Sequence, residues 1–325
     1  MKKTAIFSLV LLLAISIFAQ DKKDVVGDAV SYGDNSIEWK VYETEAPVVS
    51  FAVTNSGIWY STGEAVSLYD VKSNTRKSYA TLGKLSSAGI KSIKYSKKTG
   101  LWFAGSNGVV NLKSGKFKVY TTKNGLPSNS VKKIGVNGYD VWFCTDKGVV
   151  LNRSGSFRVY TKGDGIGNNV VNDITFDDRG DVWIATDGGV AHFQSGAVWK
   201  QYTTNDGLSF DEEKAICYDP RIGVVWVASG ESDVCSFDLQ KKAKEWNSYM
   251  EIKEGVVSIM ADTQSRIWFG STDGIIKYNQ DTWLAEPAKI GFPAAQVLDM
   301  YRDSKGDLFF GMERGILHMK NPYPY

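Results

Sequence analysis

An all-β fold made of one repeated sheet is predicted by three features of the sequence. Aromatic residues recur at intervals of 40 to 43 residues, each among β-branched neighbours and shortly before a Gly-containing turn. Four strand-like stretches, separated by Gly, Asp, Asn and Ser, fall within each interval. No helical period accompanies them. The recurring aromatic positions are Trp59, Trp102, Trp142, Trp183, Trp226, Trp268 and Phe309.

The third repeat shows the unit most clearly. Its strand-like stretches are residues 131–136, 141–145, 149–152 and 157–161. Four short antiparallel strands in units of about 40 residues are typical of a β-propeller, in which each unit forms one blade. Because the unit occurs seven times, we expect a seven-bladed β-propeller with four-stranded antiparallel blades.

The two ends of the chain predict how the ring closes. The seventh unit ends after its third strand, residues 316–320, and lacks a fourth. Fourth strands of other units carry an aromatic residue three positions before a Tyr, and the same pair, Trp39 and Tyr42, precedes the first unit. We therefore expect an N-terminal strand at about residues 37–42 to complete the last blade and to cover two sheet edges.

The beginning of the chain predicts export. A pair of lysines precedes an apolar stretch, residues 5–19, which is shorter than a membrane-spanning helix and ends in a small residue, as in a secretory signal peptide. We expect a signal peptide at residues 1–19, a polar leader at residues 20–36 and one propeller at residues 37–325, in the periplasm or outside the cell. An uncleaved membrane anchor is the alternative. No second long apolar stretch occurs, so we expect no membrane insertion of the mature chain.

The charge balance argues against nucleic acid as a partner. The chain carries 38 basic and 36 acidic residues, and the predicted signal peptide contains two of the lysines. The mature chain is therefore neutral and has no general electrostatic attraction for a polyanion.

Few residues suit metal or redox chemistry. The only histidines, His192 and His318, occupy the same position in units four and seven, too far apart to share a metal. Cys144 and Cys235 stand where other units have small or apolar residues, and a strand separates Cys217 from Cys235. We expect structural histidines, free structural thiols, no metal, no cofactor and no catalytic residue.

The most regular residues of the repeat are expected to be structural. A Trp that occurs in nearly every unit is best explained as core between blades. Asp146, Asp187 and Asp273 stand next to a hairpin Gly, where turns favour Asp.

The connection Asn124-Gly125-Leu126-Pro127-Ser128-Asn129-Ser130-Val131 and the Trp-Phe-x-Thr-Asp-x-Gly hairpin that follows resemble the two-component regulator propeller family. Weaker copies begin at Gly163 and Asn205. The resemblance implies a periplasmic sensor propeller, of a kind that recognises glycan-derived ligands and signals through a membrane helix to a histidine kinase. Because only five residues follow Lys320, we expect a module without its own membrane segment or kinase.

A ligand site is expected where the connections between blades and the starts of the innermost strands meet around the central channel. These segments carry amide, charged and aromatic side chains that do not repeat from unit to unit, a combination that suits a polar ligand such as an oligosaccharide or a peptide. The same residue types also serve tight turns. The candidate ligand-binding residues are Asn129, Lys132, Lys133, Asn169, Asn172, Asp173, Phe210, Lys214, Gln296 and Asp299.

These features together predict an exported, free-standing binding propeller whose partner is a polar small molecule, a glycan or a protein. A structural or protein-interaction scaffold is the first alternative. An enzyme is the second, because the hairpin is also similar to that of the streptogramin lyases, whose chemistry uses a His, acidic residues and a divalent metal. The chain has no His-x-Glu pair, which disfavours this alternative.

Overall fold

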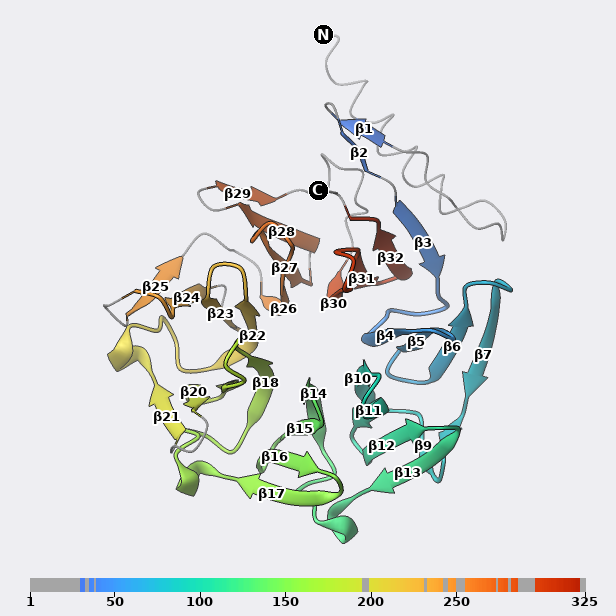
Figure 1. Ribbon diagram of the computed structural model, residues 1–325, viewed down its shortest axis with the longest axis horizontal. Helices are drawn as coiled ribbons and strands as arrows, with labels where there is room; N and C mark the ends of the chain where they lie inside the picture. The colour runs from blue at the N-terminus through green and yellow to red at the C-terminus, as the bar shows by residue number, and fades with distance from the viewer. Residues whose placement is uncertain are drawn as a thin grey trace.

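Seven four-stranded antiparallel sheets stand around a central axis, which confirms the predicted all-β, seven-bladed propeller (Figure 1). The computed structural model describes residues 30–32, 35–37, 39–194, 199–230, 233–241, 245–249, 255–272, 274–279, 282–285 and 296–321. The first strand of each blade lies nearest to the axis and the fourth lies at the outside (Figure 1).

Blades 1 to 6 are each built from four consecutive strands. Blades 1 to 3 contain β4 (Ser50–Thr54), β5 (Gly57–Ser61), β6 (Val66–Asp70) and β7 (Thr75–Tyr79); β10 (Ile90–Ser96), β11 (Gly100–Gly105), β12 (Gly108–Lys113) and β13 (Lys116–Tyr120); β14 (Val131–Asn137), β15 (Asp140–Thr145), β16 (Gly148–Arg153) and β17 (Ser156–Tyr160). Blades 4 to 6 contain β18 (Val171–Phe176), β19 (Val182–Thr186), β20 (Gly189–Phe193) and β21 (Trp199–Tyr202); β22 (Glu213–Asp219), β23 (Val224–Ser229), β24 (Val234–Asp238) and β25 (Trp246–Tyr249); β26 (Val256–Ala261), β27 (Ile267–Ser271), β28 (Gly274–Asn279) and β29 (Thr282–Ala285). In blade 3 every predicted strand end lies within one residue of the observed end.

Blade 7 combines the two ends of the chain, as predicted. Its strands are β30 (Val297–Arg302), β31 (Leu308–Met312), β32 (Gly315–Met319) and β3 (Trp39–Glu43), in that order from the axis outward. β3 pairs antiparallel with β32 and places Val41 opposite Leu317. The side chain of Tyr42 is buried and packs against Tyr69 of blade 1, with ring centroids 5.3 Å apart. The closing strand therefore joins blade 7 to blade 1.

β3 begins two residues later than expected. Ile37 lies instead in a separate two-stranded sheet formed by β1 (Val30–Tyr32) and β2 (Asn35–Ile37). Another small sheet, β8 (Thr81–Leu82) with β9 (Leu85–Ser86), lies in the connection between blades 1 and 2.

Three connections between blades share one construction, which explains the Asn/Asp-Gly-Leu/Ile pattern in the sequence. Each contains a 3-10 helix whose last side chain accepts a hydrogen bond from the backbone N–H of a preceding Thr. A Gly with a left-handed backbone ends each helix, a conformation that other residues adopt only with strain. The next residue, Leu126, Ile166 or Leu208, is buried. The helices are η1 (Thr122–Asn124), η2 (Lys162–Asp164) and η3 (Thr204–Asp206).

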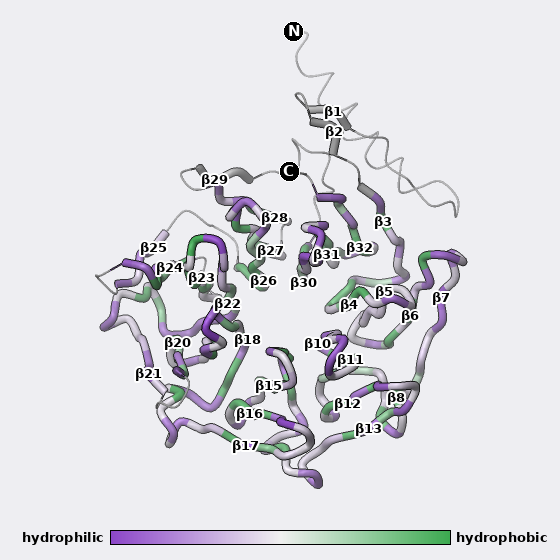
Figure 2. Tube along the Cα trace, viewed as in Figure 1, coloured by the Kyte–Doolittle hydropathy of each residue, from purple (hydrophilic) through white to green (hydrophobic). Residues whose placement is uncertain are grey.

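The repeated aromatic residues form the core between blades, as predicted. All seven are buried. Trp59 packs against Phe103 of the next blade at 5.5 Å between ring centroids, and Trp102 packs in the same way against Phe143 at 5.6 Å. A Cβ added at Gly270 would lie 2.7 Å from the carbonyl oxygen of Val297 in the next blade, so this position favours glycine. Turns at the outer rim are mostly hydrophilic (Figure 2).

Side chains at the unit position of Ser92, the third residue of β10, link the blades near the axis; in blade 1 this residue is Ser50, the first of β4. The hydroxyl of Ser92 accepts a hydrogen bond from the backbone N–H of Ile134 in the next blade at 3.1 Å. Ser50 connects three blades, because its hydroxyl accepts from the N–H of Ile93 at 3.0 Å and donates to Asp299 at 2.7 Å. These hydrogen bonds hold neighbouring innermost strands in register.

The Ser50→Ala variant is expected to lower the free energy of unfolding by about 1 to 3 kcal/mol, because it leaves a buried N–H and a buried carboxylate without this partner. Ser258 provides a matched control, since it occupies the same position in blade 6 but its hydroxyl has no hydrogen-bond partner among the described residues. Ser258→Ala should change stability by less than about 0.5 kcal/mol. Denaturant unfolding of both variants measures the difference, and equal losses would contradict the assignment.

Candidate functional site

Most of the predicted site residues lie at one end of the central channel. Because neighbouring strands are antiparallel, each first strand begins at the same end as the turn between the second and third strands and the connection from the preceding blade. We call this end the channel mouth. It contains the starts of β10, β14, β18 and β22, from which the candidate lysine and asparagine side chains project.

Five side chains form a continuous network at the channel mouth, and we refer to them as the mouth network: Lys132, Asn172, Asp187, Glu212 and Lys214. Lys132 donates to the carboxamide oxygen of Asn172 at 2.6 Å. Asn172 donates to Asp187 at 2.7 Å and to the backbone carbonyl of Glu213, also at 2.7 Å. Lys214 donates to Asp187 at 3.1 Å and pairs with Glu212. The network thus connects blades 3, 4 and 5.

Burial and neighbouring charges shift the pKa values of the mouth network in different directions. Burial lowers the pKa of Lys132, and Lys214 and Lys91 lower it further, while Asp187 acts in the opposite direction. Burial also lowers the pKa of Lys214, but hydrogen bonds to Glu212 and Asp187 outweigh it and the net shift is upward. For Asp187 burial raises the pKa, and bonds from Asn172 and Lys214 reverse this and lower it. Of the two lysines in the mouth network, only Lys132 therefore has a lowered pKa.

Deeper in the channel, Lys133, Asp173 and Asp299 form a second group, the channel triad. The ammonium nitrogen of Lys133 lies 3.7 Å from a carboxylate oxygen of Asp299. β14 and β30, which carry them, stand on opposite sides of the axis (Figure 1), so this ion pair crosses the channel. Asp173 accepts from the backbone N–H of Ile216 at 3.1 Å.

Burial and the opposite charges within the channel triad determine the pKa values of Lys133 and Asp173. Burial lowers the pKa of Lys133, but Asp299 and Asp173 outweigh this effect and the pKa is raised. The pKa of Asp173 is raised, chiefly because the carboxyl is buried, although Lys133 opposes the shift. Both carboxylates also accept backbone hydrogen bonds, which fix their positions in the channel.

Four other candidates lie outside both groups. The side chain of Asn129 accepts the N–H of Thr122 at 2.8 Å, and that of Asn169 accepts the N–H of Lys162 at 2.7 Å. These two asparagines therefore shape the blade connections. Phe210 is an exposed aromatic residue in the connection before β22, and Gln296 is half-buried just before β30.

Sequence reasoning missed three residues at the mouth. Asp187 was expected to serve only its turn, but its carboxylate lies at the centre of the mouth network. Lys91 occupies the position in β10 that Lys132 occupies in β14, a correspondence that an alignment of the units could have shown. Glu213, 1% exposed, occupies a position where the other first strands have Val or Ile. Asp273 was also expected to serve a turn and lies outside the described residues.

The three cysteines are free, as predicted, and lie on β15, β22 and β24. Two grooves of about 160 and 360 Å³ lie between blades at the end opposite the channel mouth, the first beside Lys98, Trp102 and Tyr139. They lie away from every predicted site residue. Among the described residues no helix is long and apolar enough to cross a membrane.

Comparison with known proteins confirms the fold and the repeat. The profile of the two component regulator propeller matches residues 165–188, which contain one of the predicted connections and the hairpin that follows. A comparison with curated proteins finds no relative. The chain thus carries this repeat within a complete seven-bladed ring.

Solved structures with the same fold include sensors and an enzyme. The extracellular domain of the one component system BT4673 from B. thetaiotaomicron has a TM-score of 0.71 and 14% identity, over 86% of this chain and 39% of that domain. The extracellular domain of the hybrid two component system BT3049 from B. thetaiotaomicron has a TM-score of 0.69 and 17% identity, over 86% and 40%. A catalytically inactive virginiamycin B lyase from Staphylococcus aureus with quinupristin has a TM-score of 0.68 and 16% identity, over 88% and 99%. The chain spans about two fifths of the length of the two sensor domains, and identities this low establish the fold alone.

Proposed function

We propose that the chain is an exported ligand-binding module of the sensor-propeller type, which takes an oligosaccharide at the channel mouth. One observation carries the proposal. The residues that align with the second residue of β10 are polar in four consecutive blades and apolar in the other three, and in blade 1 this residue directly precedes β4. In blade order from blade 1 they are Val49, Lys91, Lys132, Asn172, Lys214, Val257 and Leu298.

This division matches the chemistry of a sugar. Hydroxyl groups both donate and accept hydrogen bonds, and the mouth network offers ammonium and amide donors beside carboxylate acceptors. The C–H face of a sugar ring is apolar and suits the side on which Val257 is exposed. The fold by itself does not require the division, because the repeat tolerates both kinds of side chain at this position.

Two other observations, the N-terminal sequence and the similar solved structures, support export and the sensor role. The predicted signal peptide directs the chain out of the cytoplasm, and the similar sensor structures are extracellular domains. The lyase similarity supports an enzyme less well, because both histidines of the chain lie on third strands and neither is part of the mouth network.

A thermal-shift screen of the mature protein against neutral and acidic oligosaccharides and short peptides tests the proposal. A ligand that binds only the folded state raises the melting temperature by several degrees when it is well above its dissociation constant. Lys214→Ala and Asn172→Ala should weaken binding about tenfold or more, since each removes direct polar contacts.

Lys123→Ala is the matched control, because Lys123 is exposed in η1 at the same end and lies outside the mouth network. It should leave binding unchanged. A sugar-induced shift that survives both network variants would contradict the location. A shift with peptides alone would favour the protein-interaction scaffold.

A further inference from the structure

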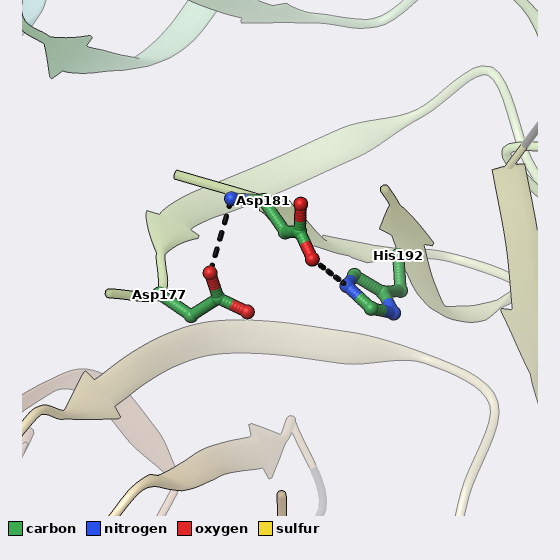
Figure 3. Close-up of side chains that lie close together, drawn as sticks. All are labelled: Asp177, Asp181 and His192. Atoms are coloured by element: carbon green, nitrogen blue, oxygen red, sulfur yellow. Dashed lines mark hydrogen bonds and ion pairs between the residues drawn. The ribbon is translucent and has the colours of Figure 1, made fainter. Parts of the chain in front are cut away.

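We propose that Asp177, Asp181 and His192 of blade 4 form a structural site for a divalent transition-metal ion of the zinc type, at the end of the propeller opposite the channel mouth. Each residue offers one ligand atom, and these atoms all lie within 4.8 Å of one another (Figure 3). The two aspartates flank the turn between β18 and β19, and His192 lies on β20. All three are buried.

The imidazole of His192 is fixed in position, and its Nε2 atom contacts Asp181 without a hydrogen bond among the described residues. It stacks on Trp183 with ring centroids 3.7 Å apart and planes 11° apart. The residue is 4% exposed, and its Nε2 atom has no hydrogen-bond partner among the described residues. This nitrogen faces Asp181 Oδ2 at 3.5 Å, too far for a hydrogen bond. A buried nitrogen of this kind is costly unless something binds it.

Backbone contacts preorganise the carboxylates. Oδ1 of Asp177 accepts hydrogen bonds from the N–H groups of Arg179 and Asp181, each at 3.0 Å. Oδ2 of Asp177 accepts from the indole N–H of Trp183 at 3.3 Å and from the guanidinium of Arg179 at 3.2 Å. The turn therefore holds the Asp177 carboxylate in place before any ion arrives, and Asp181 Oδ2 lies 3.5 Å from the imidazole.

The charge of the cluster favours a further cation. Arg179 contacts both carboxylates, at 3.2 Å from Asp177 and 3.5 Å from Asp181. Its side chain is 59% exposed and can turn into solvent. A divalent ion beside the imidazole would be attracted by the negative charge of the two buried carboxylates.

One imidazole and two carboxylates as ligands favour zinc over calcium and magnesium. Zinc binds imidazole nitrogen and carboxylate oxygen at about 2.0–2.2 Å, so two ligands of a tetrahedral zinc ion lie about 3.4 Å apart. The 3.5 Å between His192 Nε2 and Asp181 Oδ2 fits this spacing. Calcium and magnesium prefer all-oxygen sites with more ligands.

The equivalent positions of blade 7 provide a natural comparison. There Asp303, Asp307 and His318 occur at the same places in the unit, but His318 Nε2 lies 2.9 Å from Asp307 Oδ2 and makes a hydrogen bond. The imidazole of blade 7 is therefore satisfied by the protein itself, unlike that of blade 4.

Metal titrations of the full mature chain test the proposal. After treatment with a chelator, zinc chloride should raise the melting temperature by several degrees, and magnesium or calcium chloride should not. Cobalt(II) should give visible d–d absorption without the charge-transfer band that thiolate ligands produce. Asp181→Asn should weaken zinc binding by more than about 100-fold, since losing an outer-shell contact alone typically costs 10- to 100-fold.

His318→Ala is the matched control and should keep zinc affinity unchanged. Arg179→Ala should raise the zinc affinity, because it removes the cation that competes for the carboxylates. Since Arg179 lies at the surface, this variant should fold even if a substitution of the buried His192 does not. Absence of a zinc-dependent shift in the wild-type chain would overturn the proposal. So would a shift that survives Asp181→Asn, or one produced by calcium alone.

Discussion

A chain that begins at Thr44, and so lacks β3, is expected to melt about 10 °C or more below a chain that begins at Glu38. The shortened chain loses the whole pairing between β3 and β32 and the burial of Val41 and Tyr42. Burial of two such side chains and the ladder hydrogen bonds together contribute more than about 5 kcal/mol. A loss of this size lowers the melting temperature by about 2 to 4 °C per kcal/mol in a domain of this kind.

The chain that begins at Glu38 is the control, because it removes β1 and β2 but keeps the closing strand. A synthetic peptide of residues 38–44, added in excess, should restore part of the stability of the shortened chain. Equal melting of the two chains, or no effect of the peptide, would contradict closure of the ring by β3.

The Glu213→Gln variant is expected to be more stable than the wild-type chain at pH 8, by roughly 3 to 5 kcal/mol, and nearly equal to it at pH 4.5. Burial raises the pKa of Glu213 to about 8, and Asp211 and Asp233 add to the rise while Lys214 opposes it. One carboxylate oxygen has no hydrogen-bond partner among the described residues. The folded state therefore holds a proton that the unfolded chain releases at its ordinary pKa.

The sign follows from this difference in bound protons. Between about pH 4.5 and 8 the folded state binds one more proton at Glu213 than the unfolded state, so stability falls as pH rises, by up to about 1.4 kcal/mol per pH unit. Denaturant unfolding at several pH values measures the slope. Glu212→Gln, at the exposed neighbouring position, should keep the wild-type slope. A Glu213→Gln variant with the same slope as wild type would contradict the assignment.

The fold could be predicted because its determinants repeat. The aromatic position occurs in all seven units, the Asn/Asp-Gly-Leu/Ile connection occurs three times, and the incomplete seventh unit indicates how the ring closes. The start of the closing strand was the weak point, because the aromatic pair Trp39 and Tyr42 fixes its position in the repeat but nothing nearby marks where it begins. Ile37 was placed in it and pairs in another sheet.

The candidate site was predictable only in part. Lys132, Asn172 and Lys214 were found because they depart from the repeat at the channel mouth. The role of Asp187 in the mouth network could not be predicted, because a turn also favours Asp at this position. Its contact with Lys214 depends on the neighbouring blade. The acidic neighbours of His192 come from the turn before β19, and only the pairing of β19 with β20 brings them to the imidazole.

Hydrogen exchange with and without the sugar that gives the largest thermal shift tests the central claim most directly, because it reports where the ligand binds. Binding at the channel mouth predicts slower exchange in the peptides that contain residues 131–133, 171–173 and 212–214. The peptides of the groove at the opposite end, which contain residues 98–102 and 139–141, should exchange at the same rate in both conditions. Protection confined to the groove would place the site at the other end of the propeller and contradict the account.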